Sequence, residues 1–210
     1  MTDLLPYDDE DKIEIGIDEA GRGCLFGEVF VAGVILPKNI KELMEEEKIV
    51  IKDSKKISKK KRMKAKEFIE RVAIDYCVVS KDNKVIDQKN ILNATIEGMH
   101  QVLDQIQTRP NKILVDGNRF KFYRDKDGEL IEHKCVTGGD NKYLSIASAS
   151  ILAKTNKDIH MVNLVNNNPE LEKYDLVNNS GYGTKKHIEA IKKYGTTEFH
   201  RKTFGLCAHY

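Results

Sequence analysis

The amino-acid sequence predicts an α/β fold in which a mixed central β-sheet is flanked by helices and followed by a helical C-terminal portion from about residue 143. Strand-like apolar runs and helical apolar stripes alternate along the first two thirds of the chain, and mainly helix signals follow. With 210 residues, the chain can bury one core without disulfides or structural metals. We expect a single domain over residues 13–210, preceded by an acidic segment, residues 1–12, whose order the sequence leaves open.

The first two strands are predicted from hydrophobic pattern. Ile13, Ile15 and Ile17 alternate with polar or small residues, which predicts a short strand that ends at Asp18. Glycines then mark a turn, and the apolar run 28–36 is expected to pair back onto the first strand. Later runs predict further strands at 74–78, 112–116 and 131–136, the first of them from the alternation of Ile74, Tyr76 and Val78.

Helices are predicted where apolar residues recur with a period near 3.6 and a capping residue precedes them. Ser58 can cap a helix of this kind, and an apolar stripe over residues 92–106 indicates a second one. Residues 145–154 are rich in small side chains, which allow close backbone packing. Thr184 can cap a last helix that Gly195 closes.

Charge is segregated along the chain although the net charge is only +2. Residues 52–66 carry nine basic side chains and one acidic one, whereas residues 1–14 carry six acidic and one basic. Such a basic block suggests phosphate contacts, although lysine-rich helix faces are often simply solvated. The cysteines form no C-x-x-C pair, and we find no signal peptide or bilayer-length apolar run. We expect a soluble cytoplasmic protein, with access to the nucleus if the host is eukaryotic.

Three acidic residues lie where strands are predicted to end, namely Asp18, Glu19 and Asp116. Strand ends and the adjoining loops are where α/β sheets usually bind ligands, so these acids can converge. Adjacent strand residues point to opposite faces, so Asp18 and Glu19 can share a site only if the chain leaves strand geometry between them. Clustered carboxylates favour Mg²⁺ or Mn²⁺. Spacing alone favours the plainer interpretation that the aspartates form turns.

Six sequence blocks stand out along the chain: IGIDEAGRGCLFG at 15–27, DSK at 53–55, ILVDGN at 113–118, GGDNKYLSIASASILAK at 138–154, SGYGTKKH at 180–187 and HRKTF at 200–204. In this order they resemble type 2 ribonuclease H, the ribonuclease HII family. The resemblance covers residues 13 to 205 and implies a ribonuclease H-like fold, dependence on divalent metals and endonucleolytic cleavage of RNA within RNA–DNA duplexes. It also implies action at single ribonucleotides embedded in DNA.

The resemblance implies four catalytic and metal-binding acids: Asp18, Glu19, Asp116 and Asp140. Asp140 follows from the resemblance alone, because by pattern it would be a plain cap of the next helix. Two cations, Mg²⁺ or Mn²⁺, would activate water and stabilise the leaving 3′-oxygen, which leaves a 5′-phosphate and a 3′-hydroxyl.

The turn Gly21-Arg22-Gly23 corresponds to the family segment that contacts the ribose. Its backbone can test for the 2′-hydroxyl, the group that distinguishes RNA from DNA. A dinucleotide fingerprint is rejected because Phe26 occupies the place of the third glycine. An ordinary glycine turn between strands is the structural alternative.

Other substrate contacts are also implied by the resemblance. Tyr182 matches the tyrosine that stacks on the deoxyribose after the ribonucleotide, and the alternative is a loop tyrosine packed on the core. Asp53, Ser54 and Lys55 match the family segment near the scissile bond, while the other lysines of the block would attract phosphates generally. A second basic surface is suggested by Lys185, Lys186, His187, His200, Arg201 and Lys202.

Two other function classes remain open. A metal-dependent exonuclease of the same fold would carry its first acids as D-x-E, whereas here they are adjacent. A non-catalytic hybrid-binding module would have no use for four repelling carboxylates. We expect a monomer that acts on RNA–DNA hybrids and ribonucleotide-containing duplex DNA, with no membrane association and no obligate protein partner.

Overall fold

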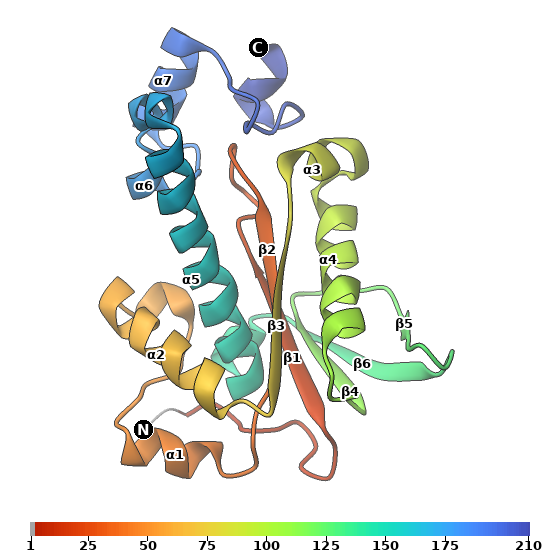
Figure 1. Cartoon of the computed structure of the whole chain (residues 1–210). Coiled ribbons are helices and arrows are strands. Elements are labelled where there is room, and N and C mark those ends of the chain that lie inside the picture. The colour runs from red at the N-terminus through yellow and green to blue at the C-terminus, as the bar shows by residue number, and fades with distance from the viewer. Residues whose placement is uncertain (1–2) are drawn as a thin grey trace.

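The computed structural model describes residues 3–210, so Met1 and Thr2 of the predicted acidic segment lie outside the described residues. Its centre is a six-stranded sheet with the strand order β3-β2-β1-β4-β6-β5. Helices cover both faces of the sheet, and the C-terminal helices gather beyond one end of it (Figure 1). The predicted mixed sheet with flanking helices and a helical C-terminal part is confirmed.

The strands are β1 (Glu14–Ala20), β2 (Val29–Ile35), β3 (Asp75–Lys81), β4 (Lys112–Asp116), β5 (Tyr123–Arg124) and β6 (Leu130–Val136). The α-helices are α1 (Ile40–Glu46), α2 (Lys59–Val72), α3 (Asn83–Lys89), α4 (Ile91–Gln105), α5 (Leu144–Asn167), α6 (Leu176–Asn179) and α7 (Lys185–Tyr194). The short 3₁₀ helices are η1 (Ser54–Lys56), η2 (Gly139–Asn141), η3 (Pro169–Tyr174) and η4 (Gly205–His209).

The central strand β1 is antiparallel to β2 and parallel to β4. Its pairing with β2 continues to Ala20, whereas its register with β4 ends at Ile17 opposite Val115. Strand β6 lies parallel on the other side of β4. The carboxyl ends of three parallel strands therefore share one edge of the sheet, and β1 extends past the end of its neighbour.

Two apolar layers hold the helices on the sheet. Helix α4 packs on one face around Met99 and Val102, and α5 packs on the other face, beside α2 (Figure 1). The small side chains of α5 are buried, and the helix approaches β1 so closely that a Cβ at Gly16 would lie 2.3 Å from the carbonyl carbon of Ser145. The predicted role of the small-residue segment, close backbone packing, is confirmed.

The helix caps also follow the sequence. The Ser58 hydroxyl accepts a hydrogen bond from the Lys61 amide at 3.4 Å at the start of α2, and Thr184 caps α7 in the same way. Gly195 ends α7 with a φ of +79°, in the left-handed region that favours glycine.

Two strand predictions need correction. Strand β1 does not end at Asp18 but continues to Ala20, because β2 still pairs with it there. The strand predicted at 74–78 is β3, which is shifted to Asp75–Lys81. Two of the alternating residues, Ile74 and Tyr76, are exposed, and Cys77 packs in the apolar layer beneath α4. Strand β3 lies at the edge of the sheet, where partly covered apolar residues on both faces obscure the period of two.

Candidate functional site

A pocket of about 500 Å³ opens at the carboxyl ends of β1 and β4. It contains every predicted site residue except Asp53, although these residues come from five separate blocks of the chain. The lining residues are Asp18, Glu19, Ala20, Gly21, Arg22, Gly23, Ser54, Lys55, Asp116, Asp140, Ser150, Lys154 and Tyr182.

Asp18 and Asp116 face the pocket from neighbouring parallel strands. Each follows the last paired residues of the two strands, so they occupy corresponding positions at the same sheet edge. The Asp18 carboxylate accepts a hydrogen bond from the Glu19 amide at 2.7 Å. The Asp116 carboxylate accepts one from the Gly139 amide, also at 2.7 Å. These bonds hold both carboxylates at the carboxyl ends of the strands, just beyond the last pair between β1 and β4.

Glu19 reaches the same pocket without a break in the strand. The expectation that the chain must leave strand geometry after Asp18 is wrong, because β1 runs past the end of β4 and both of its faces border the opening. One Glu19 carboxylate oxygen accepts from Arg22 Nη1 at 3.2 Å. The other, Oε2, is buried and has no hydrogen-bond partner among residues 3–210.

Asp140 lies in the 3₁₀ turn η2, immediately before α5. The alternative that it caps the following helix is wrong, since Gly138 precedes η2 and Tyr143 is the N-cap residue of α5. Its carboxylate accepts a hydrogen bond from Asn141 Nδ2 at 2.9 Å. Asp140 is thus available to the pocket rather than used as a cap.

The four acidic side chains of the pocket lie among three basic ones, Arg22, Lys55 and Lys154, and the carboxylates repel one another. Burial raises the pKa of Asp18 well above its usual range, and the neighbouring Glu19 and Asp116 carboxylates raise it further. Burial also raises the pKa of Glu19, against the opposing effect of Arg22. The pKa of Asp140 is raised by burial and then by Asp116. Charged carboxylates in this pocket therefore require protons or cations as partners.

The donor set fits a hard divalent cation, because it consists of carboxylate oxygens, repels itself and includes the unpartnered Glu19 Oε2. As the side chains stand, no group of three or more His, Cys, Asp or Glu residues within 3–210 is arranged to hold a metal ion. Cation binding would therefore draw the carboxylates toward one another across the pocket.

The Gly21-Arg22-Gly23 turn forms the rim beside Glu19. Gly21 has a φ of +99°, and a Cβ there would lie 2.6 Å from Lys157 Cε, so both conformation and space require glycine. Arg201 Nη1 donates to the Arg22 carbonyl at 2.9 Å from beneath the turn. The turn is therefore held in place by residues far away in the sequence.

Tyr182 reaches the pocket from the C-terminal part of the chain. It pairs with Cys24 in an isolated β-bridge, which places it next to the glycine turn. Tyr182 is 40% exposed and lines the pocket, so it packs on the core only in part, and its contact with the substrate sugar stays a prediction. Partial burial raises the pKa of Tyr182 to about 12, and its hydroxyl stays protonated at neutral pH.

Only part of the segment 53–55 lines the pocket. Ser54 and Lys55 line the pocket, but Asp53 does not. The Asp53 carboxylate instead accepts a hydrogen bond from the Lys55 amide at 2.9 Å and so caps η1. Asp53 therefore holds the backbone of Lys55 in place. A direct contact of Asp53 with substrate stays a prediction.

Ser150 and Lys154 line the pocket but were missed by the sequence reasoning. They lie four residues apart on α5, which places them on one face of the helix. Ser150 also contacts Ser54, with 3.0 Å between the two hydroxyl oxygens. Their polar character at helical spacing within an otherwise small and apolar segment is the signal that could have identified them.

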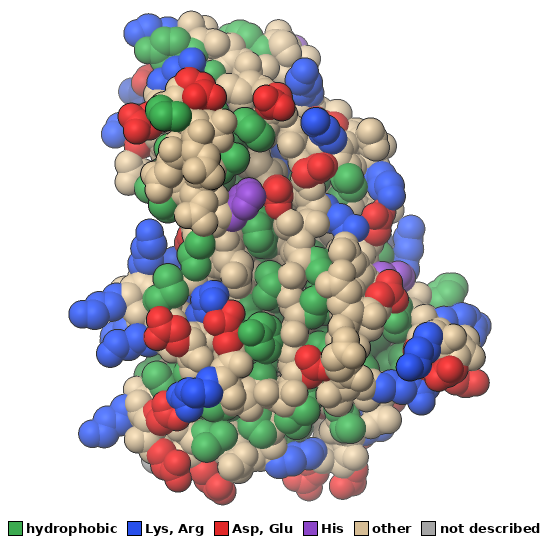
Figure 2. Space-filling model, in the orientation of Figure 1, with side chains coloured by type: hydrophobic (Ala, Val, Ile, Leu, Met, Phe, Trp, Pro, Cys, Tyr) green, Lys and Arg blue, Asp and Glu red, His purple; other side chains and the backbone are tan. Residues whose placement is uncertain are grey.

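The basic residues fall into two groups. Exposed lysines gather over α2 at the left edge of the molecule (Figure 2), in the block singled out from the sequence. Arg62 of the same block is buried and donates to the Ser54 carbonyl at 2.9 Å, so it supports η1 instead of attracting phosphate. His187, His200 and Arg201 are fully buried, which removes them from the proposed second basic surface.

No helix in the described part of the chain is long and apolar enough to cross a membrane. Comparison with known proteins found the family model for ribonuclease HII, which matches residues 15–207. A curated ribonuclease HII of Bacteroides fragilis is 49% identical over 203 residues, which cover 97% of this chain and 94% of the relative.

Solved structures are similar in fold. Ribonuclease H2 from Pyrococcus horikoshii superposes with a TM-score of 0.75 at 25% identity and covers 93% of this chain and 95% of its own. Bst-RNase HIII in complex with Mn²⁺ gives a TM-score of 0.64 at 18% identity, covers 93% of this chain and 68% of its own, and supports the fold alone. The near-complete matches in sequence establish that the chain belongs to the ribonuclease HII family and is an endoribonuclease of the ribonuclease H type.

Proposed function

We propose that the protein cleaves the RNA strand of RNA–DNA hybrids and nicks duplex DNA on the 5′ side of single embedded ribonucleotides. The observation that supports this most strongly is the convergence of Asp18, Glu19, Asp116 and Asp140 on one pocket beside the glycine turn. The carboxylates would bind the metal ions there, while the backbone of the turn would contact the 2′-hydroxyl of the ribose.

Family membership and the donor set support divalent-metal dependence, and the Mn²⁺ complex of Bst-RNase HIII is consistent with it. Two Mg²⁺ or Mn²⁺ ions held by the four acids would supply an activated water and stabilisation of the leaving 3′-oxygen. Lys55 and Lys154 line the same pocket and would attract the scissile phosphate. Their positive charges would offset the repulsion between the substrate and the acids.

We assign the discrimination between ribose and deoxyribose to the backbone of residues 21–23. Gly21 and Gly23 leave no side chain between the turn and the pocket, so amide and carbonyl groups can approach a 2′-hydroxyl. Tyr182 lies next to this turn, 40% exposed, and its ring would stack on the following deoxyribose. A ribose at that position would carry an additional hydroxyl and fit less well.

The test is a cleavage assay on an internally labelled duplex with one ribonucleotide, with Mn²⁺ and with chelator. We expect a single internal nick that leaves a 5′-phosphate on the ribonucleotide and disappears with chelator. Asp116→Asn and Asp140→Asn should fold and bind the duplex but lose cleavage. Shortening from the ends would indicate an exonuclease, and binding without any cut would indicate a hybrid-binding module.

Tyr182→Ala tests the junction-sensing role. We expect cleavage at a lone ribonucleotide to fall more than cleavage within a long hybrid, because the deoxyribose contact exists only at the junction. Stacking of a base on an aromatic ring is worth about 1–3 kcal/mol, and a sugar contact of this size corresponds to a loss of roughly 5- to 160-fold. Tyr194→Ala, at an exposed tyrosine outside the pocket, is the matched control. Equal losses on the two substrates would exclude this role.

A further inference from the structure

The N-terminal arm, residues 4–8, is attached to the start of α5. The Leu5 amide donates to the Lys142 carbonyl at 2.8 Å, and the Leu5 carbonyl accepts from the Leu144 amide at 2.9 Å. The N-cap residue of α5, Tyr143, makes no side-chain cap bond. Because the first amides of a helix lack intrahelical partners, the carbonyl of Leu5 serves as the cap that the helix itself does not provide.

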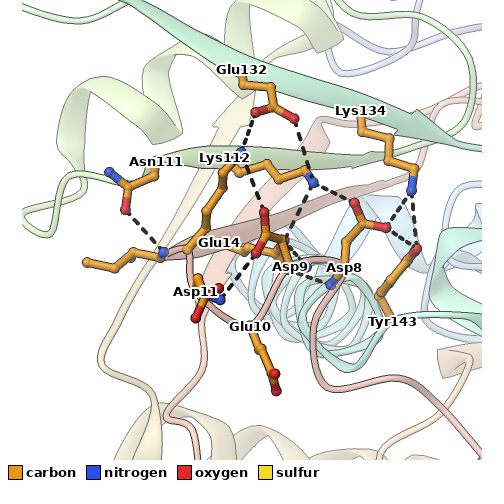
Figure 3. A network of polar contacts seen from close by, with 12 residues as sticks. Asp8, Asp9, Glu10, Asp11, Glu14, Asn111, Lys112, Glu132, Lys134 and Tyr143 are labelled. Atoms are coloured by element: carbon orange, nitrogen blue, oxygen red, sulfur yellow. Dashed lines mark hydrogen bonds and ion pairs between the residues drawn. The ribbon is translucent and has the colours of Figure 1, made fainter.

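Asp8 anchors this arm in a network of polar contacts (Figure 3). Its carboxylate accepts hydrogen bonds from the Tyr143 hydroxyl at 2.5 Å and from Lys112 Nζ at 2.6 Å, and it also pairs with Lys134. Only 12% of the Asp8 side chain is exposed. The two lysines and the tyrosine hold the pKa of Asp8 well below its usual range.

Glu14 fixes the backbone that leads into this anchor. Its two carboxylate oxygens accept the amides of Asp8 at 2.9 Å and of Asp9 at 2.8 Å. The Glu14 side chain is only 2% exposed and lies 4.0 Å from Lys112 Nζ. Two acidic residues near the N-terminus thus contact the sheet: Asp8 and Glu14 lie against Lys112 of β4, and Asp8 also pairs with Lys134 of β6.

The arm is connected to the Asp140 turn through the backbone. The amides of Lys142 and Tyr143 both donate to the Gly139 carbonyl, at 2.9 and 2.8 Å. On the other side, the Gly139 amide donates to the Asp116 carboxylate at 2.7 Å. The turn that carries Asp140 is therefore held between Asp116 and Tyr143, and Tyr143 is held by Asp8.

We propose that the N-terminal arm positions Asp140: Asp8 fixes Tyr143, and Tyr143 with Leu5 keeps the turn 139–141 in the place where its carboxylate faces the pocket. Asp8 is on this basis a positioning residue, remote from the reacting atoms. The consequence for metal binding and cleavage rests on the proposed function, whereas the consequence for the order of the turn does not.

Asp8→Asn removes the charge and preserves the shape of the side chain. Hydrogen exchange of the amides 139–144 should accelerate about tenfold, the factor expected when a charge-assisted hydrogen bond is replaced by a weaker neutral one. Exchange in β1 should stay unchanged. The Mn²⁺ concentration for half-maximal binding, measured by electron paramagnetic resonance, should rise severalfold, and cleavage should recover at saturating Mn²⁺.

Asp9→Asn is the matched control, because the Asp9 side chain lies on the same segment and reaches Lys12 instead of Tyr143. Tyr143→Phe provides a second variant, since it removes the hydroxyl and keeps the ring. It should reproduce the effects of Asp8→Asn, and the double variant should add little to either one.

Unchanged exchange at 139–144 in both variants would overturn the proposal. Faster exchange with unaltered Mn²⁺ affinity would also overturn it, because the arm would then contribute stability alone. If the wild-type protein binds Mn²⁺ but cuts no ribonucleotide-containing duplex, the proposed function fails, and the exchange and Mn²⁺ measurements still decide the role of the arm.

Discussion

We expect a pair of buried histidines to make the stability of this protein depend on pH. The rings of His187 and His200 are fully buried, with their Nε2 atoms 3.2 Å apart. The Thr197 amide donates to His200 Nδ1 at 2.9 Å, so the His200 proton belongs on Nε2 and points to His187. His187 in turn donates from Nδ1 to the Tyr182 carbonyl at 3.0 Å. An additional proton on His187 Nε2 would meet the Nε2 proton of His200. One on His200 Nδ1 would meet the Thr197 amide, and its only acceptor nearby among residues 3–210 would be the Thr197 hydroxyl, 2.9 Å away.

Burial lowers the pKa of both rings, and His187 helps to lower that of His200 to about 4. In the unfolded chain His200 titrates at its ordinary value of 6.5. Because the folded pKa is the lower one, the stability contribution is fully present above pH 6.5 and is lost as the pH falls toward 4. At about 1.4 kcal/mol for each pH unit, this interval corresponds to about 3 kcal/mol for His200.

Urea unfolding between pH 7.5 and 4.5 measures this effect. We expect the free energy of unfolding to fall as the pH decreases, with a smaller slope in His200→Gln. The matched control is His209→Gln, at an exposed histidine near the end of the chain, which should retain the wild-type slope. Titration of the His200 ring by NMR measures its pKa in the folded protein directly. A ring that titrates near 6.5, or equal slopes in all three proteins, would refute the reasoning.

Two further predictions concern packing and charge. Gly16→Ala should destabilise the protein by about 1–3 kcal/mol in urea unfolding, because the new Cβ would lie 2.3 Å from the Ser145 backbone. Gly23→Ala is the control and should change stability little, because the atom nearest to its new Cβ would be 3.8 Å away. Equal costs for the two variants would contradict this packing. Lys55→Ala should reduce the log–log slope of duplex binding against salt by about 0.9, as expected for the loss of one phosphate contact. The control Lys41→Ala, on α1, should leave the slope unchanged. An unchanged slope in Lys55→Ala would show that Lys55 contacts no phosphate.

Much of the fold and part of the site could be predicted from sequence because their signals are local. Asp18 and Asp116 end apolar strand runs, and parallel strands bring their carboxyl ends to one edge, so the pattern allowed their convergence, although spacing alone favoured plain turns. Asp140 lies in a 3₁₀ turn without periodicity, so only the resemblance to a family could identify it. Ser150 and Lys154 were missed because their segment was interpreted by its small residues alone.

Burial of charged residues was the main feature that the sequence did not reveal. Arg62 belongs to a lysine-rich run, yet it turns inward to Asp158 at 3.0 Å, a partner 96 residues away. Asp8 lies in an acidic run that suggests a solvated segment, yet it is bound by Lys112 and Lys134 from the sheet. Such pairings depend on long-range contacts, which composition and periodicity do not encode.

The most direct measurement is anomalous diffraction from crystals grown with Mn²⁺. We expect anomalous density for Mn²⁺ between the carboxylates of Asp18, Glu19, Asp116 and Asp140, with these side chains closer together than in the metal-free geometry. Density elsewhere, or none at a Mn²⁺ concentration that supports cleavage, would contradict the assignment of these four residues as the metal site.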